Sequence, residues 1–186
     1  MYIPSHNAET RLPILHQMMT DHPLAAVVTL GQDGLIATHM PLVLEDDGSE
    51  FGVLKGHVSR ANPQWRNPVP NVEALAIFSG PQHYISPNWY PGKLDDGKEV
   101  PTWNYVTVHA YGPLRIVEDA PADFIASLLR GIVGFELPIR KLEGKWKVSQ
   151  NRNDADRQGA VEGLSQLNTK EASVMARLIS DATPGK

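Results

Sequence analysis

The amino-acid sequence predicts a mainly β protein with flanking helices. About six apolar segments with the composition of strands follow one another through the middle of the chain, separated by turns rich in glycine and proline. Segments with helical spacing stand at both ends. Successive strands without intervening helices favour a barrel or a sandwich over a parallel sheet. We therefore expect a barrel core over about residues 24–150.

The length and composition predict a single domain over residues 1–186. A chain of 186 residues with 41% hydrophobic and 20% charged residues can bury one core. The sequence contains neither internal repeats nor a low-complexity tract. The helices at the two ends are therefore expected to belong to the same domain as the barrel.

The first predicted element is a helix over residues 7–22. Asn7 is a suitable N-cap, Pro13 falls near the first turn, where proline is best tolerated, and Pro23 ends the helix. The apolar face of this helix would consist of Leu12, Leu15, Met18 and Met19.

Strands are expected next, beginning with a hairpin. Residues 24–30 and 35–45 are apolar segments on either side of a Gln-Asp-Gly turn. Residues 80–101 are rich in proline, glycine and aromatic residues, which predicts an ordered loop. The other expected strands are 51–58, 72–80 and 102–117, the last with a bulge or kink at Gly112-Pro113.

The remaining third of the chain has a more helical pattern. Residues 119–137 predict a helix with Asp119 as its cap. Residues 138–150 predict a return to strand with a turn at Glu143-Gly144. Two terminal helices are expected over about residues 154–182.

The bulk composition excludes several kinds of protein. There is no cysteine, which excludes disulfides, thiolate metal sites and cysteine nucleophiles. A net charge of −4 and a pI of about 5.9 do not predict the basic surface of a protein that grips DNA phosphates. No apolar run reaches the ~20 residues of a membrane span, and the first residues lack the features of a signal peptide. We expect a cytoplasmic protein without a membrane partner.

The segment LKGHVSRANPQW, residues 54–65, has the densest group of polar side chains beside a strand. Lysine and arginine supply charge, while serine, asparagine and backbone N–H groups supply short-range donors, a combination that suits a phosphate group. No glycine-rich loop opens a helix here, so the segment is neither a P-loop nor a dinucleotide fingerprint. A solvated strand end is the ordinary alternative. The polar residues are Lys55, His57, Ser59, Arg60, Asn62 and Gln64.

Other residues give weaker evidence of chemistry. The histidines at 39, 57, 83 and 109 lack the spacing of metal ligands, so we predict no metal site, although a histidine acid or base stays open. No G-x-S-x-G elbow is present to support a Ser-His-Asp triad. The aromatic residues around TWNY would ordinarily pack, but such groups also stack on planar ligands such as a flavin. They are Tyr84, Trp89, Tyr90, Trp103 and Tyr105.

Six segments, taken together, resemble one family. MYIPSH, GLIATHMPL, GHVSRANPQW, FSGPQHYISPNWY, VPTWNYVTVHAYG and RGIVGFELPIRKLEGKWKVSQNR occur in this order over nearly the whole chain. They closely resemble the PaiB family, described as FMN-binding negative transcriptional regulators. This family belongs to the FMN-binding split β-barrels, relatives of pyridoxine phosphate oxidase. The resemblance implies a six-stranded antiparallel Greek-key split β-barrel, FMN as cofactor, and a homodimer with the flavin in clefts between protomers.

The resemblance also implies roles for particular residues. Backbone groups of Thr38, His39 and Met40 would face the isoalloxazine ring. The phosphate would be held by His57, Ser59 and Arg60, helped by Lys55 or Asn62. Trp103 and Asn104 would approach the flavin, in one arrangement from the partner protomer. Further cleft residues would be Lys147, Ser149 and Gln150.

The chain departs from the family pattern at two places. Asn7 stands where the family usually has an aromatic residue. The family also has an extra helical stretch between a RIVED-like strand end and a DAP helix, which VEDAPADF joins directly here. The shorter connection puts the cleft wall, and any substrate pocket, in question.

The function implied by the resemblance is that of a negative transcriptional regulator. The acidic charge, and the lack of a helix-turn-helix with a basic recognition helix, do not support direct DNA binding. One alternative is an FMN-dependent oxidoreductase or flavin reductase acting on a small molecule. A haem- or flavin-handling module is the other. No catalytic residue, reductant or substrate can be identified from the sequence, so enzymatic activity stays open.

Overall fold

A computed structural model describes residues 1–66, 69, 71–92, 99–117 and 131–182. The chain forms two compact units, and β6, β7 and β10 contribute residues to both. The single domain expected over residues 1–186 stays a prediction. The first unit contains Met1–Glu9, Gly80–Thr107 and Gly144–Lys186, and the second contains Thr10–Ser79 and Val108–Glu143.

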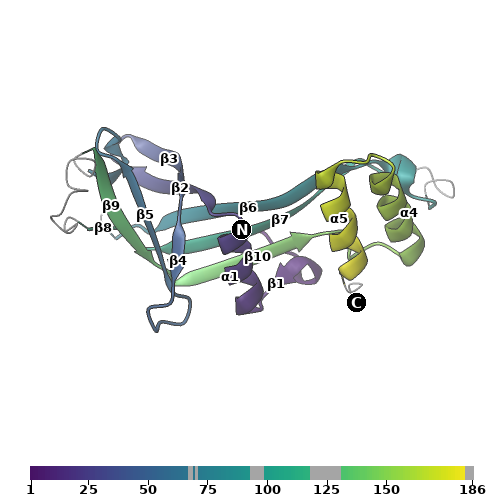
Figure 1. Cartoon of the computed structure of the whole chain (residues 1–186), viewed down its shortest axis with the longest axis horizontal. Helices are drawn as coiled ribbons and strands as arrows, with labels where there is room; N and C mark the ends of the chain where they lie inside the picture. Colours follow the sequence, from purple (N-terminus) through teal and green to yellow (C-terminus); the bar gives the residue numbers. More distant parts are fainter. Residues whose placement is uncertain (67–68, 70, 93–98, 118–130, 183–186) are drawn as a thin grey trace. The chain divides into compact units, whose positions relative to one another are not determined.

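The described residues form mainly β-strands with a few helices (Figure 1). None of these helices is both long enough and apolar enough to cross a membrane. The strands are β1 (Ala8–Glu9), β2 (Leu24–Gly31), β3 (Gly34–Pro41), β4 (Val43–Glu45), β5 (Val53–Ser59), β6 (Ala74–Ile85), β7 (Thr102–Gly112), β8 (Arg115–Val117), β9 (Ile132–Pro138) and β10 (Lys141–Lys147). The helical elements are η1 (Ser5–Asn7), α1 (Leu12–Asp21), η2 (Pro63–Trp65), η3 (Pro87–Trp89), α4 (Asp154–Ser165) and α5 (Lys170–Asp181).

The strands form two antiparallel sheets, which confirms the expected split β-barrel of mainly β class. One sheet has six strands in the order β1-β10-β7-β6-β2-β3, and the other has four in the order β4-β5-β9-β8. The second sheet lies wholly in the second unit, and Figure 1 shows its strands together. The sequence predicted about six strands because β1, β4 and β8 are only two or three residues long and carry little pattern.

The first hairpin is confirmed. β2 and β3 pair from Leu24↔Pro41 to Gly31↔Gly34. Gly34 has a φ of 117°, which only glycine adopts without strain, so it allows the tight turn. Along β2 every second residue is buried, as the period of a half-buried strand requires.

Helix α1 is shorter than the expected helix over residues 7–22. Arg11 is its N-cap, and the prediction of Asn7 as cap is wrong, since Asn7 is buried at the end of η1. Pro13 lies in the first turn, where the backbone N–H has no helical partner to lose. The buried residues Leu15, Met18 and Met19 confirm the predicted apolar face.

Three local expectations are wrong because strand pairing overrides local composition. Residues 132–137 were expected to be helical but belong to β9, which pairs with β5 from Val53↔Pro138 to Ser59↔Ile132. β6 continues through Gly80-Pro81 to Ile85, and β10 continues through Glu143-Gly144 without a turn. Residues 119–130 of the predicted helix, and most of the VEDAPADF junction, lie outside the described residues.

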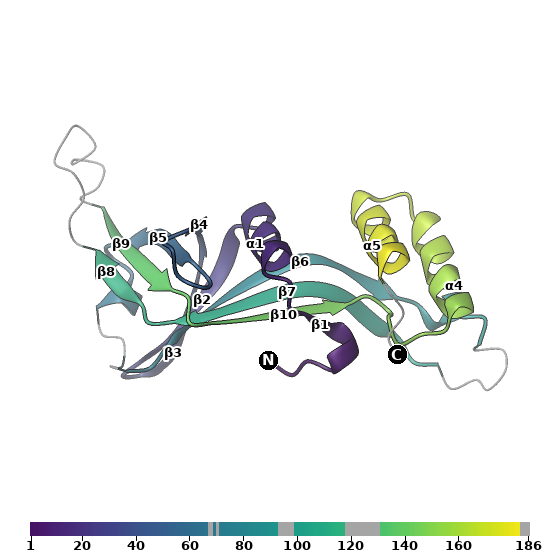
Figure 2. The ribbon, with the colours of Figure 1, turned by 90° about the horizontal axis from the view of Figure 1, so that it is seen from below.

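The two C-terminal helices are confirmed and pack against each other in the first unit (Figure 2). α5 buries Ala172, Met175, Ala176 and Ile179, a face of small and apolar residues. The buried guanidinium of Arg157 on α4 donates to Ile179 O at 2.6 Å and also to Ala182 O. It therefore satisfies carbonyl groups that the end of α5 leaves unpaired.

Candidate functional site

Strand β5 presents a row of polar side chains on one face. Lys55, His57 and Ser59 alternate with residues that face the core, of which Leu54 and Val58 are buried. His57 and Ser59 are exposed and Lys55 is partly exposed. Because β5 pairs with both β4 and β9, the row stands on a strand held from both sides.

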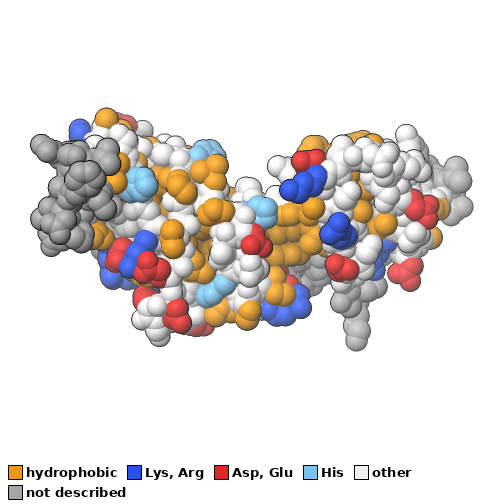
Figure 3. Space-filling view, in the orientation of Figure 1, with side chains coloured by type: hydrophobic (Ala, Val, Ile, Leu, Met, Phe, Trp, Pro, Cys, Tyr) orange, Lys and Arg blue, Asp and Glu red, His pale blue; other side chains and the backbone are white. Residues whose placement is uncertain are grey.

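The ammonium of Lys55 is engaged by two carboxylates. Its Nζ lies 2.6 Å from Glu45 Oε2 and 3.6 Å from Glu136 Oε1. The hydrogen bond to Glu45 raises the pKa of Lys55. Figure 3 shows acidic and basic side chains side by side over this four-stranded sheet. The charge of Lys55 is thus compensated within the protein itself.

Arg60 follows β5 and is fixed to the start of β9. Its backbone N–H donates to Gly131 O at 2.8 Å, and its Nη2 donates to Ile132 O at 2.9 Å. The carbonyl oxygen of Arg60 accepts from Trp65 Nε1 at 3.2 Å and from Arg66 Nη2 at 3.0 Å. Arg60 is an exposed residue, and these hydrogen bonds help to fix its position.

Asn62 joins two parts of the predicted site. Its Nδ2 donates to Thr38 Oγ1 at 2.9 Å, which brings the segment after β5 next to β3. Its Oδ1 accepts from the N–H of Gln64 at 2.8 Å and so caps η2. On β3, Thr38 is half-buried, His39 is exposed and Met40 is buried.

His39 lies at an open hollow that sequence reasoning missed. The hollow has a volume of about 470 Å³ and a mainly apolar lining. Its residues come from three separate segments of the chain, so no local motif could have revealed it. We call it the His39 hollow; its lining is Asp21, His22, Pro23, Leu24, Ala26, His39, Ile77 and Ser79.

In the first unit, three predicted cleft residues are buried and bonded internally. Asn104 is 1% exposed, and its Nδ2 donates to Ser149 Oγ at 2.9 Å. Ser149 has a φ of 63°. Gln150 accepts from the N–H of Val148 at 2.8 Å and donates to Trp146 O at 2.5 Å. These contacts hold the chain after β10, and a role toward a flavin stays a prediction.

Trp103 and Lys147 are more accessible. Trp103 is 49% exposed, and its Nε1 donates to Gln82 Oε1 at 3.0 Å. Lys147 Nζ donates to Thr102 Oγ1 at 2.5 Å and to Trp103 O at 2.9 Å. Burial lowers the pKa of Lys147. Both side chains are thus fixed in position, on β7 and β10.

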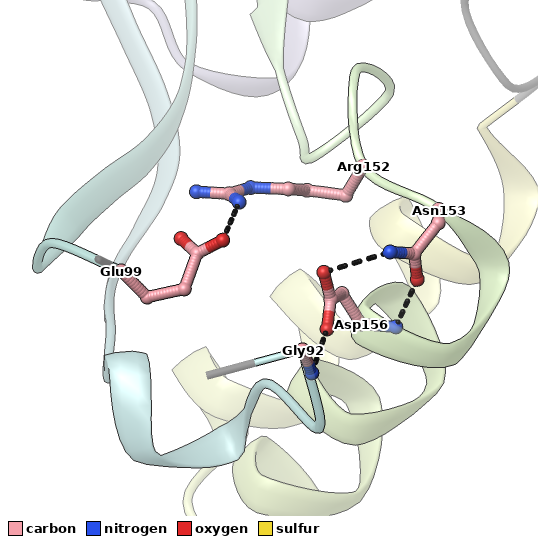
Figure 4. A network of polar contacts seen from close by, with 5 residues as sticks. All are labelled: Gly92, Glu99, Arg152, Asn153 and Asp156. Atoms are coloured by element: carbon pink, nitrogen blue, oxygen red, sulfur yellow. Dashed lines mark hydrogen bonds and ion pairs between the residues drawn. The ribbon is translucent and has the colours of Figure 1, made fainter. Parts of the chain in front are cut away.

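A polar network near the start of α4 was also missed by the sequence reasoning (Figure 4). Arg152 Nη1 lies 2.6 Å from Glu99 Oε1. Asp156 accepts from the N–H of Gly92 and from Asn153 Nδ2, both at 3.0 Å. These bonds fix residues 92 and 99 beside the helix start, which is a structural role.

Comparisons with known proteins identify relatives of the whole chain. Residues 1–120 match the family model described as "Putative FMN-binding domain". The Protease synthase and sporulation protein PAI 2 of Bacillus subtilis (strain 168) is 31% identical over 207 residues, which cover 97% of each chain. An uncharacterised protein of Emericella nidulans is 30% identical over 243 residues, again covering 97% of each. Both aligned lengths exceed 186 residues, so both relatives have residues without a counterpart here.

Solved structures with the same fold include flavoproteins. The flavocytochrome Anf3 from Azotobacter vinelandii has a TM-score of 0.57 at 13% identity, covering 78% of this chain and 72% of its own. The FAD and heme binding protein from Mycobacterium smegmatis has a TM-score of 0.54 at 13% identity, covering 76% of this chain and 73% of its own. At such low identity, these likenesses establish the fold alone.

Proposed function

Because this chain belongs to the FMN-binding domain family and is a member of the PaiB type, we propose that it is a homodimeric regulatory protein that binds FMN through the end of β5. FMN is the cofactor of the family. The observation that carries the proposal is the exposed row of donors on β5, continued by Arg60.

The chemistry of this donor set fits a phosphate group. The hydroxyl of Ser59, the imidazole of His57 and the guanidinium of Arg60 can all donate to phosphate oxygens. Lys55 is paired with carboxylates, and Asn62 donates to Thr38 Oγ1. We therefore assign phosphate binding to Ser59 and Arg60, with His57 as a supporting donor. Lys55 and Asn62 would have a structural role at this site.

The ring of the flavin would lie along β3. β3 is the last strand of the six-stranded sheet as described, and an edge strand offers backbone N–H and C=O groups to a ligand. Such groups at Thr38, His39 and Met40 suit the polar edge of an isoalloxazine ring. When bound, FMN supplies hydride and one-electron chemistry, and the protein orients it.

The test of regulation begins with the flavin-loaded protein. Wild type mixed with FMN should stay yellow through gel filtration and elute at the size of a dimer. A gel-shift assay with DNA from upstream of its own gene, at physiological salt, should depend on flavin loading if the regulator contacts DNA directly. Colourless fractions from wild type would contradict the proposal.

A second candidate function is an FMN-dependent oxidoreductase, which the His39 hollow favours. The hollow adjoins β3 and has the mainly apolar lining and few polar groups of a small-molecule site. Under this alternative, NADH or NADPH should bleach the visible absorption band of the bound flavin, because the reduced flavin no longer has it. His39→Ala should then slow turnover without loss of FMN. No bleaching by either nucleotide would favour regulation alone.

A further inference from the structure

One face of the first unit combines exposed aromatic rings with lysines. Trp103 and Tyr105 lie two residues apart on β7 and therefore share a face. Gln82 and Tyr84 share a face of β6, and Lys145 and Lys147 share a face of β10. We call these six residues the Trp103 face: Gln82, Tyr84, Trp103, Tyr105, Lys145 and Lys147.

Contacts between the strands show that these three sets lie on the same side of the sheet. Trp103 and Tyr84 meet edge to face, with ring centroids 6.1 Å apart, and Trp103 Nε1 donates to Gln82. Lys145 Nζ lies 5.2 Å from the centroid of the Tyr105 ring. The Trp103 face is therefore continuous across β6, β7 and β10.

The rings are accessible and fixed. Trp103 is 49% exposed and Tyr84 is 41% exposed, which is unusual for aromatic side chains on a folded sheet. Since the hydrogen bond to Gln82 and the contact with Tyr84 hold the indole, little side-chain entropy remains to be lost when a ligand stacks on it. Such a preorganised aromatic platform suits a flat ligand.

The charge of the Trp103 face favours an anion. Among the residues that the structure describes, neither Lys145 nor Lys147 has a carboxylate within ion-pair distance. Lys145 is only 8% exposed and its Nζ donates to Tyr2 O at 3.1 Å, whereas Lys147 is partly exposed. Lys147 is therefore the cation that a ligand on this face can reach. Burial lowers the pKa of Lys147, and the positive charges of Lys145 and Arg152 act in the same direction. The cations are thus close enough to repel one another. This local charge is positive although the whole chain has a net charge of −4.

We propose that the Trp103 face binds single-stranded nucleic acid, with unpaired bases stacked on Trp103 and Tyr84 and a backbone phosphate near Lys147. Exposed aromatic rings on adjacent strands, with basic residues beside them, are the means by which β-sheet proteins bind unpaired bases. The proposal goes beyond FMN binding and does not depend on it. It needs no helix-turn-helix, and duplex DNA would not offer the stacking faces that the platform requires.

The experiment measures binding of a fluorescein-labelled oligothymidylate of about 12 nucleotides to the FMN-loaded full chain. Fluorescence anisotropy should rise on binding, and tryptophan emission should fall. Trp103→Ala should weaken binding by roughly fivefold or more, the loss expected for one stacked base. Trp103→Phe, which keeps a stacking ring, should recover most of the affinity. A duplex of the same sequence should bind more weakly.

Salt dependence gives a second readout with a matched control. Lys147→Gln should make the slope of log affinity against log salt shallower by about 0.7, the value for one phosphate contact on a single strand. Lys170→Gln removes an equal charge from α5 and should leave the slope unchanged. Thermal melting of each variant checks that it is folded.

Four outcomes would overturn the proposal. The first is that wild type does not bind the oligonucleotide at low salt. The second is that Trp103→Ala binds the oligonucleotide with the same affinity as wild type. If Trp103→Ala instead releases FMN, the face belongs to the flavin. If it dissociates the protein into smaller species on ultracentrifugation, the face is covered by a second copy. The FMN site is tested independently of the Trp103 face. Arg60→Ala should weaken flavin retention and leave oligonucleotide binding by the Trp103 face unchanged.

Discussion

At the scale of single residues, Gln64 links η2 to the first hairpin. Its side chain is 3% exposed, and Nε2 donates to Val27 O at 2.8 Å and to Ile36 O at 3.3 Å. Its buried Oε1 has no hydrogen-bond partner among the described residues. The side-chain amide therefore connects β2 and β3 through its Nε2 donors. The buried Oε1 without a partner costs part of the free energy of folding.

Substitution of Gln64 tests this balance. Gln64→Leu keeps the volume but leaves two backbone carbonyls without a side-chain donor, so we expect a loss of about 1–3 kcal/mol in the free energy of unfolding. Urea denaturation measures it. As a comparison, Gln17→Leu alters a glutamine on the exposed side of α1 and should change stability little. Equal effects at the two positions would contradict the role given to Gln64.

Glu143 makes stability depend on acid pH. Burial alone would raise its pKa, but favourable polar interactions, among them the hydrogen bonds from Lys141 and Tyr111, outweigh that effect and lower the pKa from 4.5 to about 2. A carboxyl with a depressed pKa stabilises the fold fully above its unfolded pKa. The contribution is lost as pH falls toward the folded pKa.

We therefore expect the free energy of unfolding to decline between about pH 4.5 and pH 2, in part because Glu143 becomes protonated. Glu143→Gln should flatten this decline, while Glu136→Gln, which alters a more exposed carboxylate, should flatten it less. Denaturant melts over this pH range measure both. Parallel pH profiles for wild type and Glu143→Gln would count against the assignment.

At the scale of elements, α4 packs against η3 because two glycines remove side chains from their contact. A Cβ at Gly163 would lie 2.3 Å from Trp89 Cδ2, and a Cβ at Gly159 would lie 2.0 Å from Trp89 O. Both distances are far below a normal contact. Close approach of the helix to the tryptophan therefore requires glycine at both positions.

Gly163→Ala should destabilise the protein. Alanine favours a helix over glycine by about 1 kcal/mol, but the clash with a rigid indole reverses that gain. In the Trp89→Ala background the clash is absent, so there Gly163→Ala should become neutral or stabilising. Denaturation of the four proteins gives the coupling energy. A coupling energy near zero would refute the packing argument.

Some helices and strands could be predicted from the sequence, and others could not. The β2–β3 hairpin and the helices α4 and α5 follow from local pattern and capping residues, and the prediction for each was close. Residues 132–137 of β9 were predicted as helix because they continue a helical pattern, and only the pairing of β9 with β5 fixes them as a strand. The His39 hollow and the Trp103 face depend on long-range pairing, which no local pattern contains.

At the scale of the whole molecule, the family and fold were predictable from the ordered motifs, while the details of the site were not. Ser59 and Arg60 lie at the end of β5, where the anion site is proposed. The pairing of Lys55 with Glu45 and Glu136, and the burial of Asn104 and Gln150, depend on neighbours from distant segments. Motifs therefore identified the protein class, while the roles of the individual site residues stay predictions.

The proposed FMN site depends on Arg60 and Ser59, which would hold the phosphate. Riboflavin carries the same ring without a phosphate, so the ratio of its Kd to that of FMN measures the phosphate grip. Quenching of flavin fluorescence gives both constants. Arg115→Ala is a matched control, since it removes an exposed arginine from β8.

We predict that wild type prefers FMN and that Arg60→Ala weakens FMN binding by roughly ten- to a hundredfold, the loss of one charge-assisted hydrogen bond or pair. The affinity of Arg60→Ala for riboflavin should stay close to that of wild type. Arg115→Ala should keep the wild-type preference for FMN over riboflavin. An undiminished preference for FMN over riboflavin in Arg60→Ala would contradict the account.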